Sequence, residues 1–290
     1  MRRTYVFVLV LFLLGALMAN ETKSVATQTP DVEAAVCGSC REPFMFWLWH
    51  ILAGSPSQQR LAHIENVERL RFTTRDGIEL GGYKLTARNA KGYLLVAQGN
   101  AMLADHLVAD LPFFRDLGVD VYLFDYRGYG LSRGKSRLAA IVADYEELVA
   151  YLNNKEYAQR LLYGISMGGV ILLNAVGHSQ AYTRLVVDSS PSRISNLGCP
   201  ERYDPVRHLP EASSRIMIIS GDRDRVVTPR QMSELLTVAR TRGARVLQDH
   251  DFAHPYQDAS VETHRRRLSE VAAFLLPEPE HTSSPVHHGR

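Results

Sequence analysis

The chain has 290 residues, 46% of them apolar and 22% charged, which suits a single α/β domain with one sizeable core. Its formal net charge is +2, and acidic and basic residues alternate along the sequence. This balance excludes the clustered positive charge that marks a nucleic-acid-binding protein.

The N-terminal residues have the composition of an export or anchoring segment. Arg2 and Arg3 precede an almost purely apolar run at residues 6–18, which is shorter than the roughly 18 to 20 residues that cross a bilayer. We therefore expect a signal peptide within residues 1–26, with an uncleaved anchor as the alternative. Either one places the remaining chain outside the cytosol: periplasmic, secreted or membrane-anchored.

Residues 27–65 are expected to form a linker that ends in an aromatic segment. Cys37 and Cys40 form a C-x-x-C that could close as a small disulfide after export, whereas Cys199 alone cannot complete a zinc site. Residues 44–49 contain both tryptophans of the chain. A short helix packed against the domain is the simplest interpretation, and attachment to a membrane surface, where tryptophan is favoured, is the alternative.

Residues 66–276 have the pattern of one α/β domain. Two alternating segments flank an Asp76-Gly77 turn and predict an antiparallel hairpin. Six later runs are continuously apolar, as in strands covered on both faces, and helical stretches separate them. The predicted fold class is α/β, with a mainly parallel eight-stranded sheet and helices on both faces. The apolar runs lie at 93–97, 119–124, 160–163, 185–187, 216–219 and 244–247, and helices are expected at about 102–117, 138–154, 166–178, 229–242 and 260–275. The tail, residues 277–290, is rich in Pro, Ser and His and is expected to be disordered.

The most specific motif is Gly-Ile-Ser-Met-Gly-Gly at residues 164–169, which follows an apolar strand and opens an apolar helix. A G-x-S-x-G turn in that setting is typical of a nucleophile elbow, which lifts a serine hydroxyl clear of the sheet. Small residues two positions either side leave room for the turn, and the helix N-terminus adds positive potential beneath the hydroxyl. The motif predicts Ser166 as a nucleophile.

A serine nucleophile needs a base and a third group that orients the base. The chain order for such a triad on this fold is serine, acid, histidine. We expect Asp224 to be the acid, with Asp222 as the alternative, and His254 to be the base, with His250 as the alternative. No metal or organic cofactor is expected.

Backbone N–H groups should stabilise the developing oxyanion. One belongs to Met167, directly after the nucleophile. The second belongs to Asn100 or Ala101, in the loop after the third strand, where Gly99 permits close approach to a substrate.

Together these motifs resemble the α/β-hydrolase superfamily, and within it the branch of serine aminopeptidase-like and palmitoyl-protein-thioesterase-like enzymes. The resemblance covers residues 66–276 and includes the block at residues 125–132, which borders the active site in that family. It implies that Ser166, Asp224 and His254 form the triad.

The family usually has a histidine where this chain has Gln98. The side chain of Gln98 could brace the loop after the third strand by hydrogen bonds, and the alternative is that this loop sits differently from that of the family. Only residues 188–215 separate the sixth and seventh strands, so the resemblance implies a minimal cap and an open site. The expected reaction is hydrolysis of a carboxylic ester through an acyl-enzyme intermediate, on a small-molecule or acylated substrate. The alternatives are thioesterase, amidase, peptidase or acyltransferase chemistry with the same triad, or a non-catalytic binding protein on this scaffold.

Overall fold

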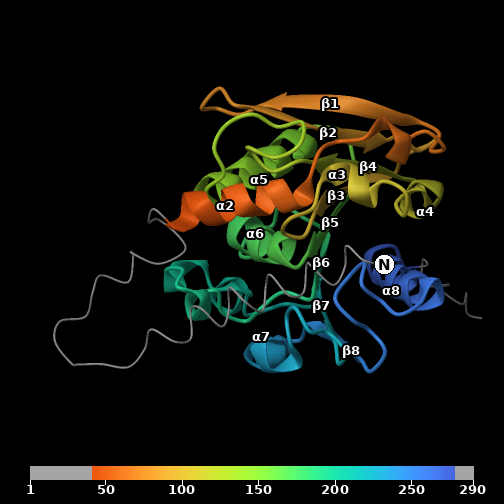
Figure 1. Ribbon diagram of the computed structural model, residues 1–290. Helices are drawn as coiled ribbons and strands as arrows, with labels where there is room; N and C mark the ends of the chain where they lie inside the picture. The colour runs from red at the N-terminus through yellow and green to blue at the C-terminus, as the bar shows by residue number, and fades with distance from the viewer. Residues whose placement is uncertain (1–40, 278–290) are drawn as a thin grey trace, which may run out of the picture. The chain divides into compact units, whose positions relative to one another are not determined.

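A computed structural model of the chain describes residues 41–277, and its strands form one eight-stranded sheet (Figure 1). The strand order is β1-β2-β4-β3-β5-β6-β7-β8. β1 and β2 pair antiparallel, as do β2 and β4, and all the other pairs are parallel. The strands are β1 (Val67–Thr73), β2 (Glu79–Leu85), β3 (Gly92–Ala97), β4 (Val119–Phe124), β5 (Gln159–Ile165), β6 (Arg184–Asp188), β7 (Ile216–Gly221) and β8 (Arg245–Asp249). The predicted mainly parallel sheet is confirmed.

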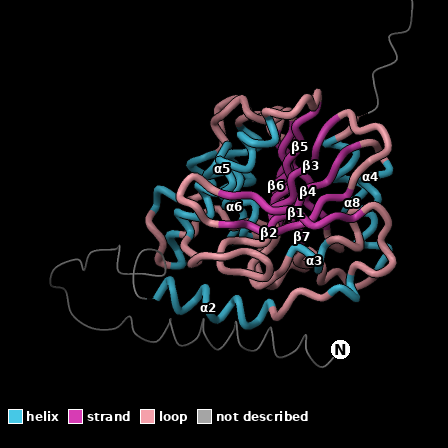
Figure 2. The backbone as a smooth tube through the Cα atoms, turned by 90° about the horizontal axis from the view of Figure 1, so that it is seen from above, coloured by secondary structure: helices cyan, strands magenta, loops and turns pink. Residues whose placement is uncertain are grey.

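Helices cover both faces of the sheet, because the central strands are apolar on both sides. Tyr93 and Leu95 of β3 belong to one buried cluster with α5, α6 and α7, whereas Leu94 and Val96 belong to a second cluster with α3, α4 and α8. Figure 2 shows α5 and α6 on one side of the strands and α4 and α8 on the other. The α-helices are α2 (Arg41–Ala53), α3 (Ala104–Leu107), α4 (Pro112–Asp116), α5 (Leu138–Asn153), α6 (Met167–Val176), α7 (Pro229–Thr241) and α8 (Val261–Leu275).

One predicted helix was wrong. In place of a continuous helix at about 102–117, the chain forms the two short helices α3 and α4. Pro112 occupies the first turn of α4, where its missing N–H is tolerated, but it could not continue a helix that began upstream.

The segment between β6 and β7 forms no large cap. It contains only single 3-10 turns: η3 (Ser195–Leu197), η4 (Glu201–Tyr203) and η5 (Pro205–His208). The expected minimal cap is therefore confirmed. Cys199 lies buried in this segment and is disulfide-bonded.

The predicted signal peptide or anchor, most of the predicted linker, the Cys37–Cys40 pairing and the predicted disordered tail lie outside the described residues. Within residues 41–277, no helix is long and apolar enough to cross a membrane.

Candidate active site

Ser166 lies in a strained turn between β5 and α6. Its φ is 53° and its ψ is −113°, a conformation that only glycine adopts freely. A Cβ on Gly168 would lie 2.0 Å from the Ala97 carbonyl oxygen, and one on Gly164 would lie 2.6 Å from the Gly169 Cα. Both glycines are therefore required for the turn, as the motif predicts.

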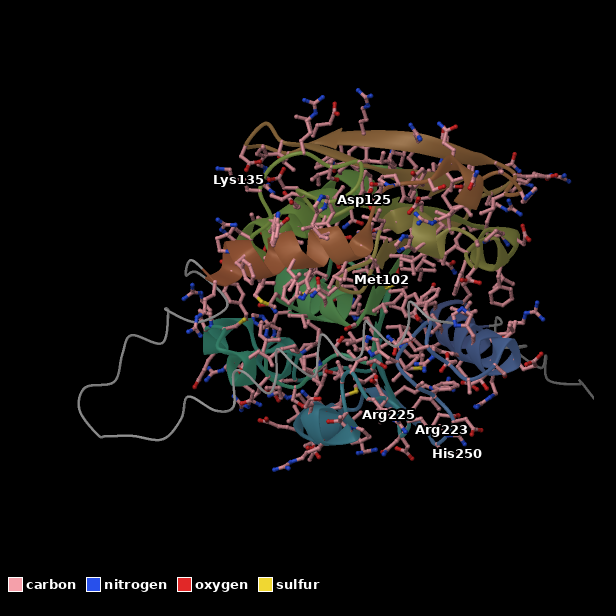
Figure 3. All side chains as sticks on the ribbon, viewed as in Figure 1. Met102, Asp125, Lys135, Arg223, Arg225 and His250 are labelled. Atoms are coloured by element: carbon pink, nitrogen blue, oxygen red, sulfur yellow. The ribbon has the colours of Figure 1, made fainter. Side chains whose placement is uncertain are left out.

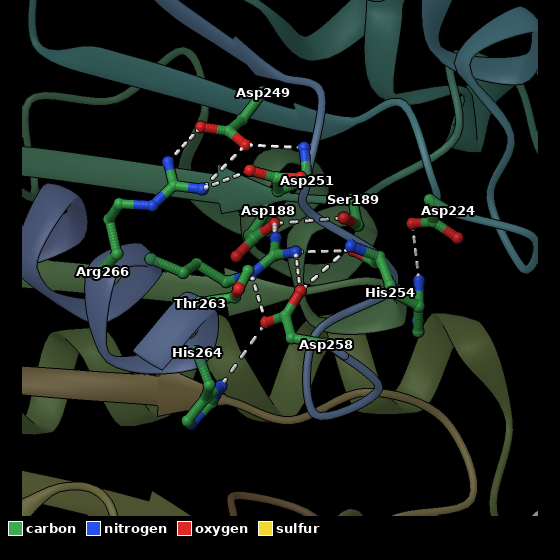
Figure 4. Close-up of polar contacts among 12 residues, drawn as sticks. Asp188, Ser189, Asp224, Asp249, Asp251, His254, Asp258, Thr263, His264 and Arg266 are labelled. Atoms are coloured by element: carbon green, nitrogen blue, oxygen red, sulfur yellow. Dashed lines mark hydrogen bonds and ion pairs between the residues drawn. The ribbon is translucent and has the colours of Figure 1, made fainter. Parts of the chain in front are cut away.

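Asp224 and His254 are hydrogen-bonded to each other. The His254 Nδ1 lies 2.8 Å from Asp224 Oδ2 (Figure 4), and both side chains are buried. The other carboxylate oxygen of Asp224 accepts hydrogen bonds from the N–H groups of Val226 and Val227, each at 2.8 Å. These bonds fix the carboxylate, so it can hold the imidazole in one orientation.

The topology brings these residues to one edge of the sheet. β5, β6, β7 and β8 are neighbours and run parallel, so their carboxyl ends lie together. Ser166 follows β5, Asp224 follows β7 and His254 follows β8. In open α/β sheets, this edge is where ligands bind.

The two alternative residues lie elsewhere. Asp222 accepts a hydrogen bond from Gln248 at the surface. The His250 side chain is 80% exposed and lies 3.3 Å from Asp251, at the outer end of the sheet near Arg223 (Figure 3). His250, Asp249 and Asp251 lie close enough together to hold a metal ion, but both carboxylates already pair with arginines.

The loop after β3 passes directly beside the serine. A Cβ on Gly99 would lie 3.7 Å from the Ser166 Cβ. The Ala101 N–H already donates to Asn100 Oδ1 at 2.9 Å, which favours the backbone N–H of Asn100 over that of Ala101 as the predicted second donor. The Met167 N–H belongs to the first turn of α6, where backbone N–H groups have no partner within the helix.

The expected brace from Gln98 was wrong. Its side-chain amide is fully buried, and it has no hydrogen-bond partner among the described residues. The loop is held instead by the Tyr126 hydroxyl, which donates to the Gln98 backbone oxygen, and by the Tyr129 hydroxyl, which lies 3.3 Å from Asn100 Oδ1.

The block at residues 125–132 is anchored by Asp125. Its carboxylate accepts hydrogen bonds from the N–H groups of Ala104, at 2.7 Å, and Leu131, at 2.8 Å. Burial raises the pKa of Asp125 to about 6, although these two bonds oppose the shift. Asp125 thus ties the block to the start of α3, beside the oxyanion loop.

Sequence reasoning missed a buried ion network that joins the elbow to the histidine loop. The backbone oxygen of Asp188 accepts a hydrogen bond from the Ser166 N–H at 2.8 Å, and its carboxylate pairs with Arg267 at 2.8 Å. Arg267 is fully buried, pairs with Asp258 at 2.9 Å and donates to the backbone oxygen of Ala253. Since Ala253 directly precedes His254, the network links the positions of Ser166 and His254.

His264 extends this network along α8. It lies 3.7 Å from Asp258 (Figure 4). It also lies 3.5 Å from Asp110, and its ring packs against Tyr256. The carboxylates of Asp110 and Asp258 raise the pKa of His264 to about 9. Burial alone would raise the pKa of Asp258, but His264 and Arg267 outweigh it and lower that pKa to about 2.

The raised pKa of His264 predicts a pH-dependent stability. Because the pKa is about 9 in the folded chain against an ordinary value of 6.5, the protonated form stabilises the fold. This stabilisation should be complete below about pH 6.5 and be lost as the pH rises through 9. Denaturant unfolding between pH 6 and 10 measures it. The decline should be shallower in His264→Gln and unchanged in His250→Gln; equal declines in all three proteins would contradict the prediction.

The strand order, the serine turn and the Asp–His pair are those of the α/β-hydrolase fold. Residues 88–200 match the family model of serine aminopeptidase, S33. The chain is 26% identical over 236 residues to uncharacterized protein YfhR of Escherichia coli (strain K12), covering 73% of this chain and 82% of that protein.

Two further proteins are similar to parts of the chain. It is 29% identical over 107 residues to uncharacterized membrane protein YNL320W of Saccharomyces cerevisiae, covering 35% of this chain and 37% of that protein. The esterase Pf2001 of Pyrococcus furiosus superimposes with a TM-score of 0.61 at 17% identity, over 76% of this chain and 96% of the esterase. The structural likeness supports the fold.

Proposed function

We propose that the protein is a serine esterase that cleaves a carboxylic ester through an acyl-enzyme intermediate. The observation that carries this proposal is the 2.8 Å bond between His254 and Asp224, at the same sheet edge as the strained Ser166. An aspartate that orients a histidine at the sheet edge of a strained serine turn is the arrangement that activates a serine hydroxyl.

Each group has one role in the proposed reaction. The Ser166 Oγ attacks the ester carbonyl carbon while His254 Nε2 takes the hydroxyl proton, and the same nitrogen returns that proton to the leaving alcohol. Asp224 keeps the Nδ1 proton in place and stabilises the imidazolium. The N–H groups of Met167 and Asn100 stabilise the oxyanion, and a water then releases the acid by the same steps in reverse.

Labelling with a fluorophosphonate tests the proposal, because only an activated serine reacts rapidly with this reagent. We expect one label, on the tryptic peptide that contains Ser166. Labelling should be lost in His254→Ala. It should be retained in His250→Ala, because the His250 side chain is 80% exposed and lies beside Asp251. Equal labelling of both histidine variants would refute the proposed base.

The type of bond that the protein cleaves can be assigned by comparing hydrolysis rates. Ester, thioester and aminoacyl-amide substrates with the same acyl group should be compared, since all four alternative chemistries use the same triad. We expect the ester to have the highest kcat/KM. A higher kcat/KM for the thioester or the amide would be compatible with the proposed triad but would contradict the proposed ester substrate.

An extracytosolic location completes the proposal. The disulfide at Cys199 is typical of oxidising compartments, and the apolar run at residues 6–18 behind Arg2 and Arg3 is typical of export or anchoring. The yeast relative's name describes that protein as a membrane protein, which agrees with attachment to a membrane.

A further inference from the structure

Helix α2 has two different faces. Its inner face packs on the domain: Phe46 is buried and lies edge-on to Trp49 and Tyr129, at ring distances of 5.2 and 6.5 Å. Glu42 accepts a hydrogen bond from the Leu138 N–H at 2.7 Å, which joins α2 to the start of α5. The inner face therefore holds α2 firmly in place.

The outer face of α2 is apolar and exposed. Phe44, Trp47 and Ile51 follow the i, i+3, i+7 spacing of one helical face and are 53%, 54% and 51% exposed. Single exposed apolar residues are ordinary, but three in one stripe with two aromatic rings are not. Such an apolar stripe is typical of a surface that binds another molecule or a membrane.

Helix α2 lies beside the candidate active site through its inner face. Tyr129 touches α2 through Phe46 and His50 and also reaches Asn100 of the oxyanion loop. Figure 2 shows α2 lying along the end of the sheet where α3 begins. A surface that covered the outer face of α2 would therefore lie close to the open site.

We propose that the outer face of α2 docks on a lipid bilayer, so that the active site meets acyl esters held in or on that bilayer. Tryptophan and phenylalanine favour the interface between headgroups and acyl chains, and a rigidly held helix can lie in that plane. Where the apolar run at residues 6–18 is retained as an anchor, it would keep α2 near a membrane. The docking on a bilayer does not depend on the proposed esterase function, whereas the substrate class rests on it.

The test uses the full chain and phosphatidylcholine vesicles, which carry no net charge. The only two tryptophans lie on α2, so Trp49→Phe leaves Trp47 as the sole emitter. We expect its emission to shift to shorter wavelength with vesicles and to be quenched by lipids brominated near the headgroup. Because residues 6–18 could retain the chain on vesicles without α2, the readout at Trp47 is specific for the docking.

Charged substitutions provide the matched comparison. In the Trp49→Phe background, Phe44→Glu and Ile51→Glu should each abolish the lipid quenching of Trp47, whereas Phe113→Glu on α4, at a residue 42% exposed, should not. All three should keep wild-type rates on a water-soluble ester.

Two results would overturn the docking. One is Trp47 emission that vesicles leave unchanged. The other is Trp47 shielded from acrylamide without vesicles, because then a second copy or another segment of this chain covers α2. Ser166→Ala separates the two proposals: it should bind vesicles normally while losing ester hydrolysis.

Discussion

Replacement of Ser166 by alanine is expected to lower kcat for an activated ester by about 10⁶-fold, the loss seen when a serine nucleophile is removed from a working triad. The acyl-enzyme cannot form without the Oγ atom, and the remaining oxyanion donors give only weak catalysis. Steady-state and burst kinetics measure the loss. Retention of more than about 1% of kcat would exclude Ser166 as the nucleophile.

Ser166→Gly is the matched control for folding. Alanine keeps the strain of a positive φ at this turn, whereas glycine relieves it. We expect the glycine variant to be more stable than the alanine variant by about 1 kcal/mol in denaturant unfolding, and equally inactive. A difference in activity between two such variants would indicate that the loss came from the fold.

Replacement of Arg267 by methionine is expected to lower the free energy of unfolding by about 3 to 5 kcal/mol. The substitution leaves the buried carboxylate of Asp188 without its arginine and leaves His264 as the remaining cationic partner of Asp258. It also removes the hydrogen bond to Ala253 that holds the loop before His254. The rate of fluorophosphonate labelling should therefore fall along with stability.

Arg266 offers the neighbouring control. It is partly exposed and pairs with Asp249 and Asp251 at the surface, so Arg266→Met should cost less than about 1 kcal/mol and leave labelling unchanged. Where Arg267→Met fails to fold, Asp258→Asn keeps the shape of the site and tests the same link. Equal stability of the two arginine variants would contradict a buried network.

The strands could be predicted because they are continuous apolar runs, and the elbow because a strand precedes and a helix follows residues 164–169. Local sequence also favoured Asp224 over Asp222, and the structure places Asp224 against His254. These features depend on neighbours along the chain, where periodicity and turn chemistry carry the information.

The ion network could not be predicted in the same way. Arg267 and Asp188 are 79 residues apart, so their pairing depends on the tertiary fold. One signal was present: Arg267 falls on the buried stripe of α8 together with Leu268 and Val271, a position where a charge must have a partner. The prediction for Gln98 was wrong for the opposite reason. A glutamine side chain can form four hydrogen bonds, but that of Gln98 forms none with the described residues.

The short segment between β6 and β7 has a consequence for selectivity. With only 3-10 turns there, this segment encloses little of a bound acyl chain on the side away from the sheet. In bulk water a long acyl tail would stay hydrated, and chain length would add little to kcat/KM. On a bilayer, lipid would contact the part of the acyl chain that this segment leaves uncovered. Selectivity between short and long acyl groups should therefore depend on the surrounding medium as much as on the protein.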